Sequence, residues 1–398
     1  MSDDKIINVV TAPSPQVENL SRPFGRAGVR IIIAGGGTGG HIFPAIAIAN
    51  AIKELQPQTE FLFIGAKGKM EMEKVPQAGY KIKGLTIAGY ERSSLIKNIW
   101  LPFKLIKSFL QVKKIFKAFK PDAVIGVGGY SSFPVLKTAQ QKGIPTFIHE
   151  SNSFAGKSNI MLGKKATKIF VASEGMSKFF PEEKILITGN PVRKNIAEST
   201  VSKEEALKFF NLKKDKATVL IIGGSLGSRS INDVIVRHIR DFNPLGLQLI
   251  WQTGKSTKTT YLERAKPLKN IRANDFINEM DKAYAAADMV VSRAGAMAVA
   301  ELCVAKKPVI FVPFPHAAED HQTMNAKYLV ERNAAIMVKD EMVNTRLFTE
   351  ITSLAKDQAK QKELSNNIAA FAVKDAAKKI AEEILVHLTS QREELAGI

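Results

Sequence analysis

The chain has 398 residues, of which 45% are apolar, and its 57 Lys and Arg outnumber its 38 Asp and Glu to give a net charge of +19. This length predicts about two domains, and the single cysteine, Cys303, excludes disulfides within the chain and favours the cytosol. No segment approaches the roughly 20 consecutive apolar residues of a membrane-spanning helix. The excess positive charge predicts an anionic partner, which is nucleic acid, a membrane surface or an anionic substrate.

The first 28 residues contain acidic residues and prolines and lack a long apolar core. They do not resemble a secretory signal. We expect them to form a disordered tail.

A glycine-rich loop follows the first apolar run. Residues 29–33 are mostly β-branched, residues 34–41 read Ala-Gly-Gly-Gly-Thr-Gly-Gly-His, and Pro44 then opens a helical stretch over 45–52. A strand, a glycine-rich turn and a helix N-terminus together form an anion site. His41 ends the turn, and histidine is the acid–base residue whose ordinary pKa lies near neutrality. The sequence therefore predicts a loop that binds phosphate and can also move a proton.

Two other phosphate loops fit the glycines less well. Gly35, Gly37 and Gly40 match the dinucleotide pattern, which needs an acidic residue at the end of the second strand. We place that strand at 61–64, and it runs into Gly-Ala-Lys without a carboxylate. A kinase-type loop needs Lys after its last glycine, where this chain has His41.

Residues 93–121 contain seven lysines and no acidic residue. A helix over 105–119 would place apolar residues that are three and four positions apart on one face. This pattern alone is typical of a core helix with a solvated basic side. Residues 99–103 are too apolar, and too broken by Pro102, for an ordinary helix. Apolar side chains ringed by lysines suit an anionic bilayer surface, whereas no motif supports nucleic acid. The residues expected at the membrane are Trp100, Leu101, Phe103, Lys97, Lys104 and Lys107.

Two series of β-rich runs alternate with helical stretches along the rest of the chain. The first includes 123–127, 146–148, 168–171 and 184–187, and the second includes 218–222, 247–251, 289–291 and 308–311. This alternation predicts parallel sheets covered on both faces. Because the second series also opens on a glycine turn, at 223–227, we expect two doubly wound α/β domains that join near 189–191. Their ligands would bind at the carboxyl ends of the strands, in the cleft between them.

Three clusters would line that cleft. Residues 126–130 form a second phosphate-type loop, and 149–152 (His-Glu-Ser-Asn) offer an acid–base pair and an amide. Residues 292–301 turn from a strand into a helix of small residues, whose N–H groups can hold a pyrophosphate while Glu301 reaches ribose hydroxyls. The alternatives are a hydrogen-bonded histidine at the end of a strand for His149 and a solvated carboxylate on a helix for Glu301.

The sequence offers little for a metal. It contains no Asp-x-Asp, and His316 and His321 have no third ligand nearby. A helix dipole, glycine-loop amides and Arg193 can neutralise a leaving diphosphate instead.

Seven motifs occur in a fixed order: 36–41, 128–130, 149–152, 189–193 (Gly-Asn-Pro-Val-Arg), 223–227, 292–301 and 320–325 (Asp-His-Gln-Thr-Met-Asn). As a set they resemble the MurG family of peptidoglycan N-acetylglucosaminyltransferases, which convert lipid I to lipid II. The resemblance extends from about Val29 to the C-terminus.

The resemblance implies a GT-B fold, in which two Rossmann-like domains face each other across a cleft. The N-terminal domain (29–189) would hold the acceptor and dock on the membrane, the C-terminal domain (190–374) would bind UDP-GlcNAc, and a helix at about 375–395 would return to the first domain. No cofactor is implied. The partners would be UDP-GlcNAc, lipid I and an anionic membrane surface, without nucleic acid, at the cytoplasmic face of the bacterial plasma membrane.

The resemblance also implies roles for individual residues. Donor contacts would come from Arg193, Ser225, Ile277, Ala296, Met297, Ala298, Val299, Ala300, Glu301 and Gln322. The transferred sugar would lie near Thr38, Gly39, Gly40 and Asn152. The acceptor diphosphate would bind to Gly37, Gly128, Gly129 and Tyr130.

The expected reaction is a single inverting displacement, in which the muramyl 4-hydroxyl attacks the anomeric carbon of GlcNAc while a base takes the hydroxyl proton. His41 is the first candidate for this base, and Glu150, oriented by His149, is the second. Two other functions stay open: another lipid-directed GT-B transferase, such as a glycolipid synthase, and a non-catalytic membrane adaptor.

Overall fold

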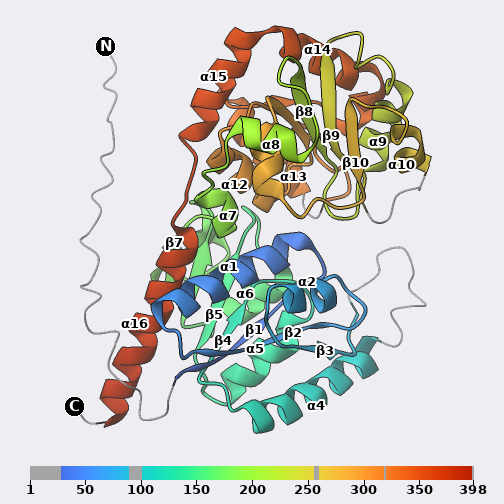
Figure 1. The fold of residues 1–398 in the computed structure, drawn as a ribbon. Helices are drawn as coiled ribbons and strands as arrows, with labels where there is room; N and C mark the ends of the chain where they lie inside the picture. The colour runs from blue at the N-terminus through green and yellow to red at the C-terminus, as the bar shows by residue number, and fades with distance from the viewer. Residues whose placement is uncertain (1–27, 89–100, 255–259, 318–319, 397–398) are drawn as a thin grey trace, which may run out of the picture.

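The computed structural model describes residues 28–88, 101–254, 260–317 and 320–396, with side chains as far as residue 391. Two sheets of parallel strands follow one another along the chain (Figure 1). The first has the order β3-β2-β1-β4-β5-β6-β7 and the second β10-β9-β8-β11-β12-β13. Their strands are β1 (Arg30–Ala34), β2 (Glu60–Ala66), β3 (Ile82–Leu85), β4 (Ala123–Gly126), β5 (Thr146–Glu150), β6 (Lys168–Val171), β7 (Ile185–Ile187), β8 (Ala217–Ile222), β9 (Leu247–Gln252), β10 (Ile271–Asn274), β11 (Met289–Ser292), β12 (Val309–Phe311) and β13 (Ile336–Met337).

Helices cover both faces of each sheet, as the continuous apolar strands require. In β1, Ile31 and Ile33 enter one core while Ile32 enters the core on the opposite face. The helices around the first sheet are α1 (Gly39–Leu55), α2 (Glu71–Gln77), α4 (Leu101–Phe119), α5 (Ser132–Gln141) and α6 (Lys157–Gly163), with the short turns η2 (Met176–Lys178) and η3 (Glu182–Lys184). Those around the second are α7 (Lys194–Ala197), α8 (Lys203–Phe209), α9 (Arg229–Arg237), α10 (Thr260–Ala265), α11 (Met280–Ala286), α12 (Ala296–Ala305), α13 (His321–Val330), η5 (Asp340–Met342), η6 (Val343–Leu347), α14 (Phe348–Lys356) and α15 (Gln358–Ala369).

The last helix, α16 (Ala376–Ala396), runs from the second sheet back to the first, where it lies along α1 (Figure 1). Its residues Ile380, Ile384 and Leu388 are at most 3% exposed and share a core with Ile31 and Ile48 of the first sheet and α1. The amino-terminal domain is therefore completed by the carboxyl-terminal end of the chain.

The predicted doubly wound α/β fold is confirmed, and each predicted strand is present. Strands β3, β10 and β13 were not predicted, because they are short and carry little hydrophobic pattern. It also placed the start of α1 wrongly at Pro44. The helix begins at Gly39, directly after the extended N-cap residue Thr38, and Pro44 removes only one N–H near the start.

The prediction that residues 99–103 are not helical is wrong for residues 101–103. Helix α4 begins at Leu101 with Pro102 in its first turn, where a missing N–H loses no helical hydrogen bond. The predicted buried face contains Val112 and Phe116. Trp100, Lys97 and the proposed disordered tail lie outside the described residues. Among the helices described, none is both long and apolar enough to span a membrane.

Candidate active site

Side chains of the two domains meet beside the N-terminal turns of α1 and α12. The Arg193 guanidinium, just after the first domain, lies 4.5 Å from the ring centroid of Phe43 in α1. The Lys74 ammonium of α2 lies 3.3 Å from Asn278 Oδ1 in the second domain. The predicted site residues are distributed on both sides of this junction.

His41 lies in the first turn of α1, and its Nδ1 is 3.1 Å from the carbonyl oxygen of Gly36. A carbonyl can only accept, so we assign the ring proton of the neutral imidazole to Nδ1. Nε2 then carries a free lone pair. Gly128 makes room for this edge of the ring, because a Cβ there would lie 2.9 Å from Nε2.

Several groups act on the pKa of His41. Burial has the largest effect and lowers the pKa below its ordinary value of 6.5. The carboxylates of Glu150 and Glu71 and the hydrogen bond to Gly36 oppose this effect, whereas His321 of α13 adds to it. His41 is therefore neutral, and able to accept a proton, at neutral pH.

Glu150 ends β5 and is 4% exposed. Its Oε1 accepts hydrogen bonds from the backbone N–H and side-chain amide of Asn152, at 3.1 and 3.2 Å. Its Oε2 accepts from Gly156 N and Asn159 Nδ2, at 3.2 and 2.8 Å. Four donors fill the acceptor capacity of a carboxylate. Glu150 thus organises the loop that follows β5 and has no lone pair left for a substrate proton.

His149 is fully buried, and neither of its ring nitrogens has a hydrogen-bond partner within the described residues. Burial, followed by the nearby His41, lowers its pKa to about 3, while Asn190 acts in the opposite direction. The two side chains form no hydrogen bond, and Glu150 is held by the four donors above, so the structure offers no contact through which His149 would orient Glu150.

The glycine loops after β1 and β4 pack directly against each other. A Cβ on Gly129 would lie 2.5 Å from the Gly36 carbonyl oxygen, and one on Gly35 would lie 2.4 Å from Val127 Cγ2. Tyr130 lies beside Gly37, and its pKa is raised by burial and by Glu71. The Gly37 N–H donates to Glu71 at 2.9 Å and is therefore not available to the acceptor diphosphate that we expected near Gly37.

On the second domain, Glu301 of α12 is held by two partners. Arg193 donates from Nε to Oε1 at 2.9 Å and from Nη2 to Oε2 at 3.1 Å, and the Tyr284 hydroxyl donates to Oε2 at 3.1 Å. Burial raises the pKa of Tyr284 well above 10, and Glu301 adds to this shift. Glu301 is therefore an ordered acceptor and not the solvated carboxylate of the alternative interpretation.

The other predicted residues lie on nearby loops and helix starts. Gln252 links two of these loops, because its Nε2 donates to Gly224 O at 3.0 Å and its Oε1 accepts from Ile277 N at 3.0 Å. Gln322 accepts from Phe314 N at 3.0 Å. The first turns of α12 carry Ala296, Met297, Ala298, Val299 and Ala300, and the turn after β8 carries Ser225. Thr38, Gly39, Gly40 and Asn152 belong to the first domain.

Three further residues of the site, Glu71, Tyr284 and Gln252, were not predicted from the sequence. None belongs to a recognised motif, and each acts by binding a motif residue across the fold. Within the described parts of the chain, no group of three or more His, Cys, Asp or Glu side chains is placed to hold a metal ion.

Comparison with known proteins gives consistent matches along the chain. Residues 31–171 match the glycosyltransferase family 28 N-terminal domain, and residues 218–380 match the glycosyltransferase family 28 C-terminal domain. The chain is 50% identical over 369 residues to a UDP-N-acetylglucosamine--N-acetylmuramyl-(pentapeptide) pyrophosphoryl-undecaprenol N-acetylglucosamine transferase of Phocaeicola vulgatus, covering 92% of this chain and 98% of that protein. A protein of the same name from Bacteroides thetaiotaomicron is 50% identical over 363 residues, covering 90% and 97%. The crystal structure of Acinetobacter baumannii MurG matches with a TM-score of 0.66 at 27% identity, covering 89% of this chain and 99% of that chain.

Proposed function

Because the chain belongs to glycosyltransferase family 28, and within it to the N-acetylglucosamine transferases whose acceptor is linked to undecaprenol, we propose that it transfers GlcNAc from UDP-GlcNAc to lipid I. The acceptor is the N-acetylmuramyl-pentapeptide linked through a pyrophosphate to undecaprenol, and the product is lipid II for peptidoglycan synthesis. The observation that carries this conclusion is 50% identity to a transferase of that name over 92% of the chain.

The arrangement around His41 supports an inverting mechanism with this residue as the base. Its Nε2 lone pair is free, because the Nδ1 proton is held by Gly36. The muramyl 4-hydroxyl would give its proton to Nε2 as its oxygen bonds to the anomeric carbon and the bond to UDP breaks. The displacement converts an α-linked donor into a β-linked product.

The same geometry disfavours Glu150 as the base. A proton on either oxygen of Glu150 would displace one of its four N–H donors. We assign Glu150 to the ordering of the loop that carries Asn152, which would place its amide near the transferred sugar.

For the donor, we propose a site on the second domain around Glu301. Within the described residues its Oε1 accepts one hydrogen bond, from Arg193, and so keeps a lone pair for a ribose hydroxyl. The N-terminus of α12 and the loops joined by Gln252 would bind the diphosphate and the base of the nucleotide. For the acceptor diphosphate, we retain Gly128, Gly129 and Tyr130.

We also propose that α4 docks on the anionic face of the plasma membrane, on its cytoplasmic side. Phe103, Ile106 and Leu110 are 60–65% exposed on this helix. Lys117 follows Leu110, and Lys113 follows Ile106, at a spacing of seven residues, so the lysines continue the same helix face. Of the residues expected at the membrane, Phe103 and Lys107 are exposed, whereas Leu101 and Lys104 are half-buried.

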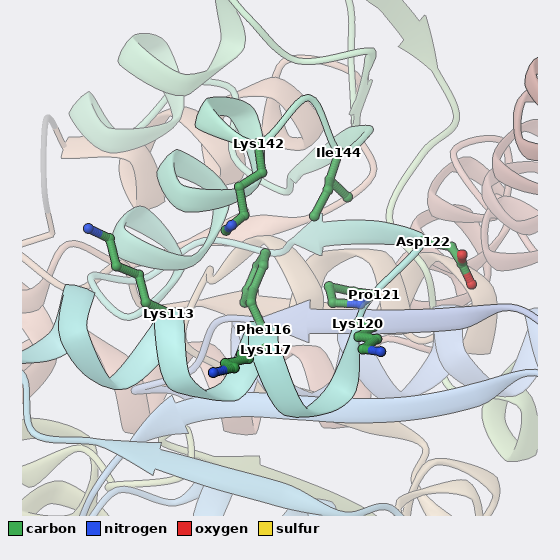
Figure 2. A pocket seen from close by; sticks show the side chains of 8 residues that line it. All are labelled: Lys113, Phe116, Lys117, Lys120, Pro121, Asp122, Lys142 and Ile144. Atoms are coloured by element: carbon green, nitrogen blue, oxygen red, sulfur yellow. The ribbon is translucent and has the colours of Figure 1, made fainter.

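A basic pocket of about 740 Å³ lies at the carboxyl end of this face. Figure 2 shows Lys113, Lys117 and Lys142 around Phe116, with Asp122 at the far side of the pocket from Lys113. These lysines form no ion pair within the described residues. An apolar stripe that leads into unpaired lysines suits acyl chains and phosphate head groups.

The test of the function is UDP release from UDP-GlcNAc with and without a lipid I analogue. Release should depend on the acceptor, and His41→Ala should reduce turnover roughly 10²–10⁴-fold. Because burial lowers the pKa of His41, activity should be full above pH 6.5 and decline as the pH falls below that value. Acceptor-independent release, or full turnover of the His41 variant, would contradict the assignment.

A further inference from the structure

We infer that Glu71 is a positioning residue for His41 and acts on it through the single peptide group that joins Gly36 to Gly37. Glu71 belongs to no recognised motif and lies on α2, outside the loop that carries His41. The inference rests on the proposed role of His41 as the base.

Two hydrogen bonds connect the carboxylate to the imidazole. Gly37 N donates to Glu71 Oε2 at 2.9 Å, and Gly36 O accepts from His41 Nδ1 at 3.1 Å. This N–H and this carbonyl belong to the same planar peptide group. The carboxylate, the peptide group and the imidazole are therefore connected in that order by two hydrogen bonds, and each bond polarises the other.

The fold holds the Glu71 carboxylate firmly in this place. Its Oε1 accepts from Ala66 N at 2.9 Å, so the side chain bridges the ends of β1 and β2 and is 1% exposed. Two glycines make the space. A Cβ on Gly36 would lie 2.4 Å from Glu71 Cδ, and a Cβ on Gly65 would lie 2.4 Å from Glu71 Cγ. Gly36 and Gly65 thus make room for the Glu71 carboxylate and not for a ligand.

The charge of Glu71 matches what the reaction requires of His41. No cation forms an ion pair with Glu71 within the described residues, so its buried negative charge is balanced only by backbone N–H groups. Such a charge opposes a phosphate at Gly37 but stabilises the positive charge that His41 gains when Nε2 takes the hydroxyl proton. Nδ1 keeps its own proton throughout this step.

Other charged groups also face His41, and the test must separate them. Glu150 and His149 approach from β5, and His321 approaches from α13. Glu150 and Glu71 raise the pKa of His41, while His321 lowers it. Of the two carboxylates, Glu71 is the one joined to the imidazole through hydrogen bonds that the structure contains.

The experiment follows the ring nitrogens of His41 by NMR in protein labelled with ¹⁵N-histidine, with His41→Asn to identify the signals. In the unmodified protein the neutral ring should carry its proton on Nδ1. Glu71→Gln is nearly isosteric, and it should lower the titration midpoint of His41 by roughly half to one pH unit. The acid limb of kcat/KM should shift in the same direction, and kcat should fall roughly tenfold or more.

Glu73→Gln is the matched control, because it makes the same chemical change on the exposed side of α2. It should leave the tautomer, the midpoint and the rate unchanged. A proton on Nε2 in the unmodified protein would overturn the inference, and this measurement does not depend on a variant that folds. An unchanged midpoint in folded Glu71→Gln would overturn it too. Full turnover of His41→Ala would instead reject the base assignment, so the two failures are distinguishable.

Discussion

Arg193 and Glu301 form a two-point ion pair between the segment that leaves the first domain and helix α12 of the second. Their side chains are 17% and 7% exposed, and the Arg193 guanidinium also lies over the ring of Phe43 in α1. One pair of residues therefore connects the proposed donor site to the helix that carries His41. A buried charge left without its partner is costly, so this pair links donor binding to stability.

Replacing Glu301 by Ala should weaken both properties. UDP-GlcNAc affinity should fall by about 1.5–3 kcal/mol, because a charge-assisted hydrogen bond to ribose is lost. The free energy of unfolding should fall by about 3–5 kcal/mol, because Arg193 is left buried and unpaired. Calorimetry with the donor and denaturant unfolding measure the two effects.

The double variant Arg193→Met with Glu301→Met is the control. It should recover stability relative to Glu301→Ala, because no unpaired charge remains, but it should not recover donor affinity. Donor affinity equal to that of the unmodified protein would show that Glu301 binds only Arg193 and Tyr284.

Replacing Glu150 by Gln should disturb the loop after β5. The amide NH₂ of Gln faces N–H donors where a carboxylate oxygen accepted them, and each unsatisfied group costs about 1–3 kcal/mol. Hydrogen exchange at the Asn152 and Gly156 amides should therefore accelerate. If turnover instead falls sharply while these amides stay protected, Glu150 acts on the substrate and His41 is not the base.

The sequence predicted the fold well because its signals are local. The Val- and Ile-rich runs of β1 and β8 and the glycine turns after them identify two doubly wound domains without any tertiary information. The errors also have local causes. Pro44 suggested a helix start, although it lies inside α1, and Pro102 suggested a break, although it lies in the first turn of α4, where proline is tolerated.

The chemistry of the site was less accessible to sequence. His41, Glu150 and Glu301 belong to motifs, but the motifs do not show which of their side-chain nitrogen and oxygen atoms can still accept a hydrogen bond. Glu71 accepts the N–H of Gly37, and Asn159 donates to Glu150, yet each is separated from its partner along the chain. The absence of a carboxylate at the end of β2 was read correctly from sequence, but the fold brings the Glu71 carboxylate to that position.

His149 should make the protein sensitive to acid. Its pKa is about 3 in the folded protein and near 6.5 in the unfolded chain, so the unfolded chain binds the extra proton between these values. Above pH 6.5 the free energy of unfolding is therefore unaffected by the titration of His149. It decreases as the pH falls from 6.5 toward 3, at up to about 1.4 kcal/mol per pH unit. Denaturant unfolding at a series of pH values measures this slope.

The variant His149→Leu should have a shallower slope over the same range. It should also be close to the unmodified protein in stability at pH 7, because both nitrogens that it removes are buried without hydrogen-bond partners in the described residues. An equally steep slope in the variant would mean that other groups cause the acid sensitivity.

The exposed face of α4 should determine membrane binding. Ile106→Asn with Leu110→Asn removes two apolar side chains, each worth roughly 1.5–3 kcal/mol when fully buried, and should weaken binding to anionic vesicles at least tenfold. Lys113→Gln with Lys117→Gln should weaken it by about 1 kcal/mol per lysine at low salt, and this effect should decrease as salt is added. Both variants should raise the apparent KM for a long-chain acceptor and spare activity on a short soluble one.

Lys213→Gln with Lys216→Gln is the matched control, because these lysines line a second basic pocket, of about 380 Å³, on the other domain. If the control weakens vesicle binding as much as the α4 variants do, binding depends on the total charge of the protein and not on this helix.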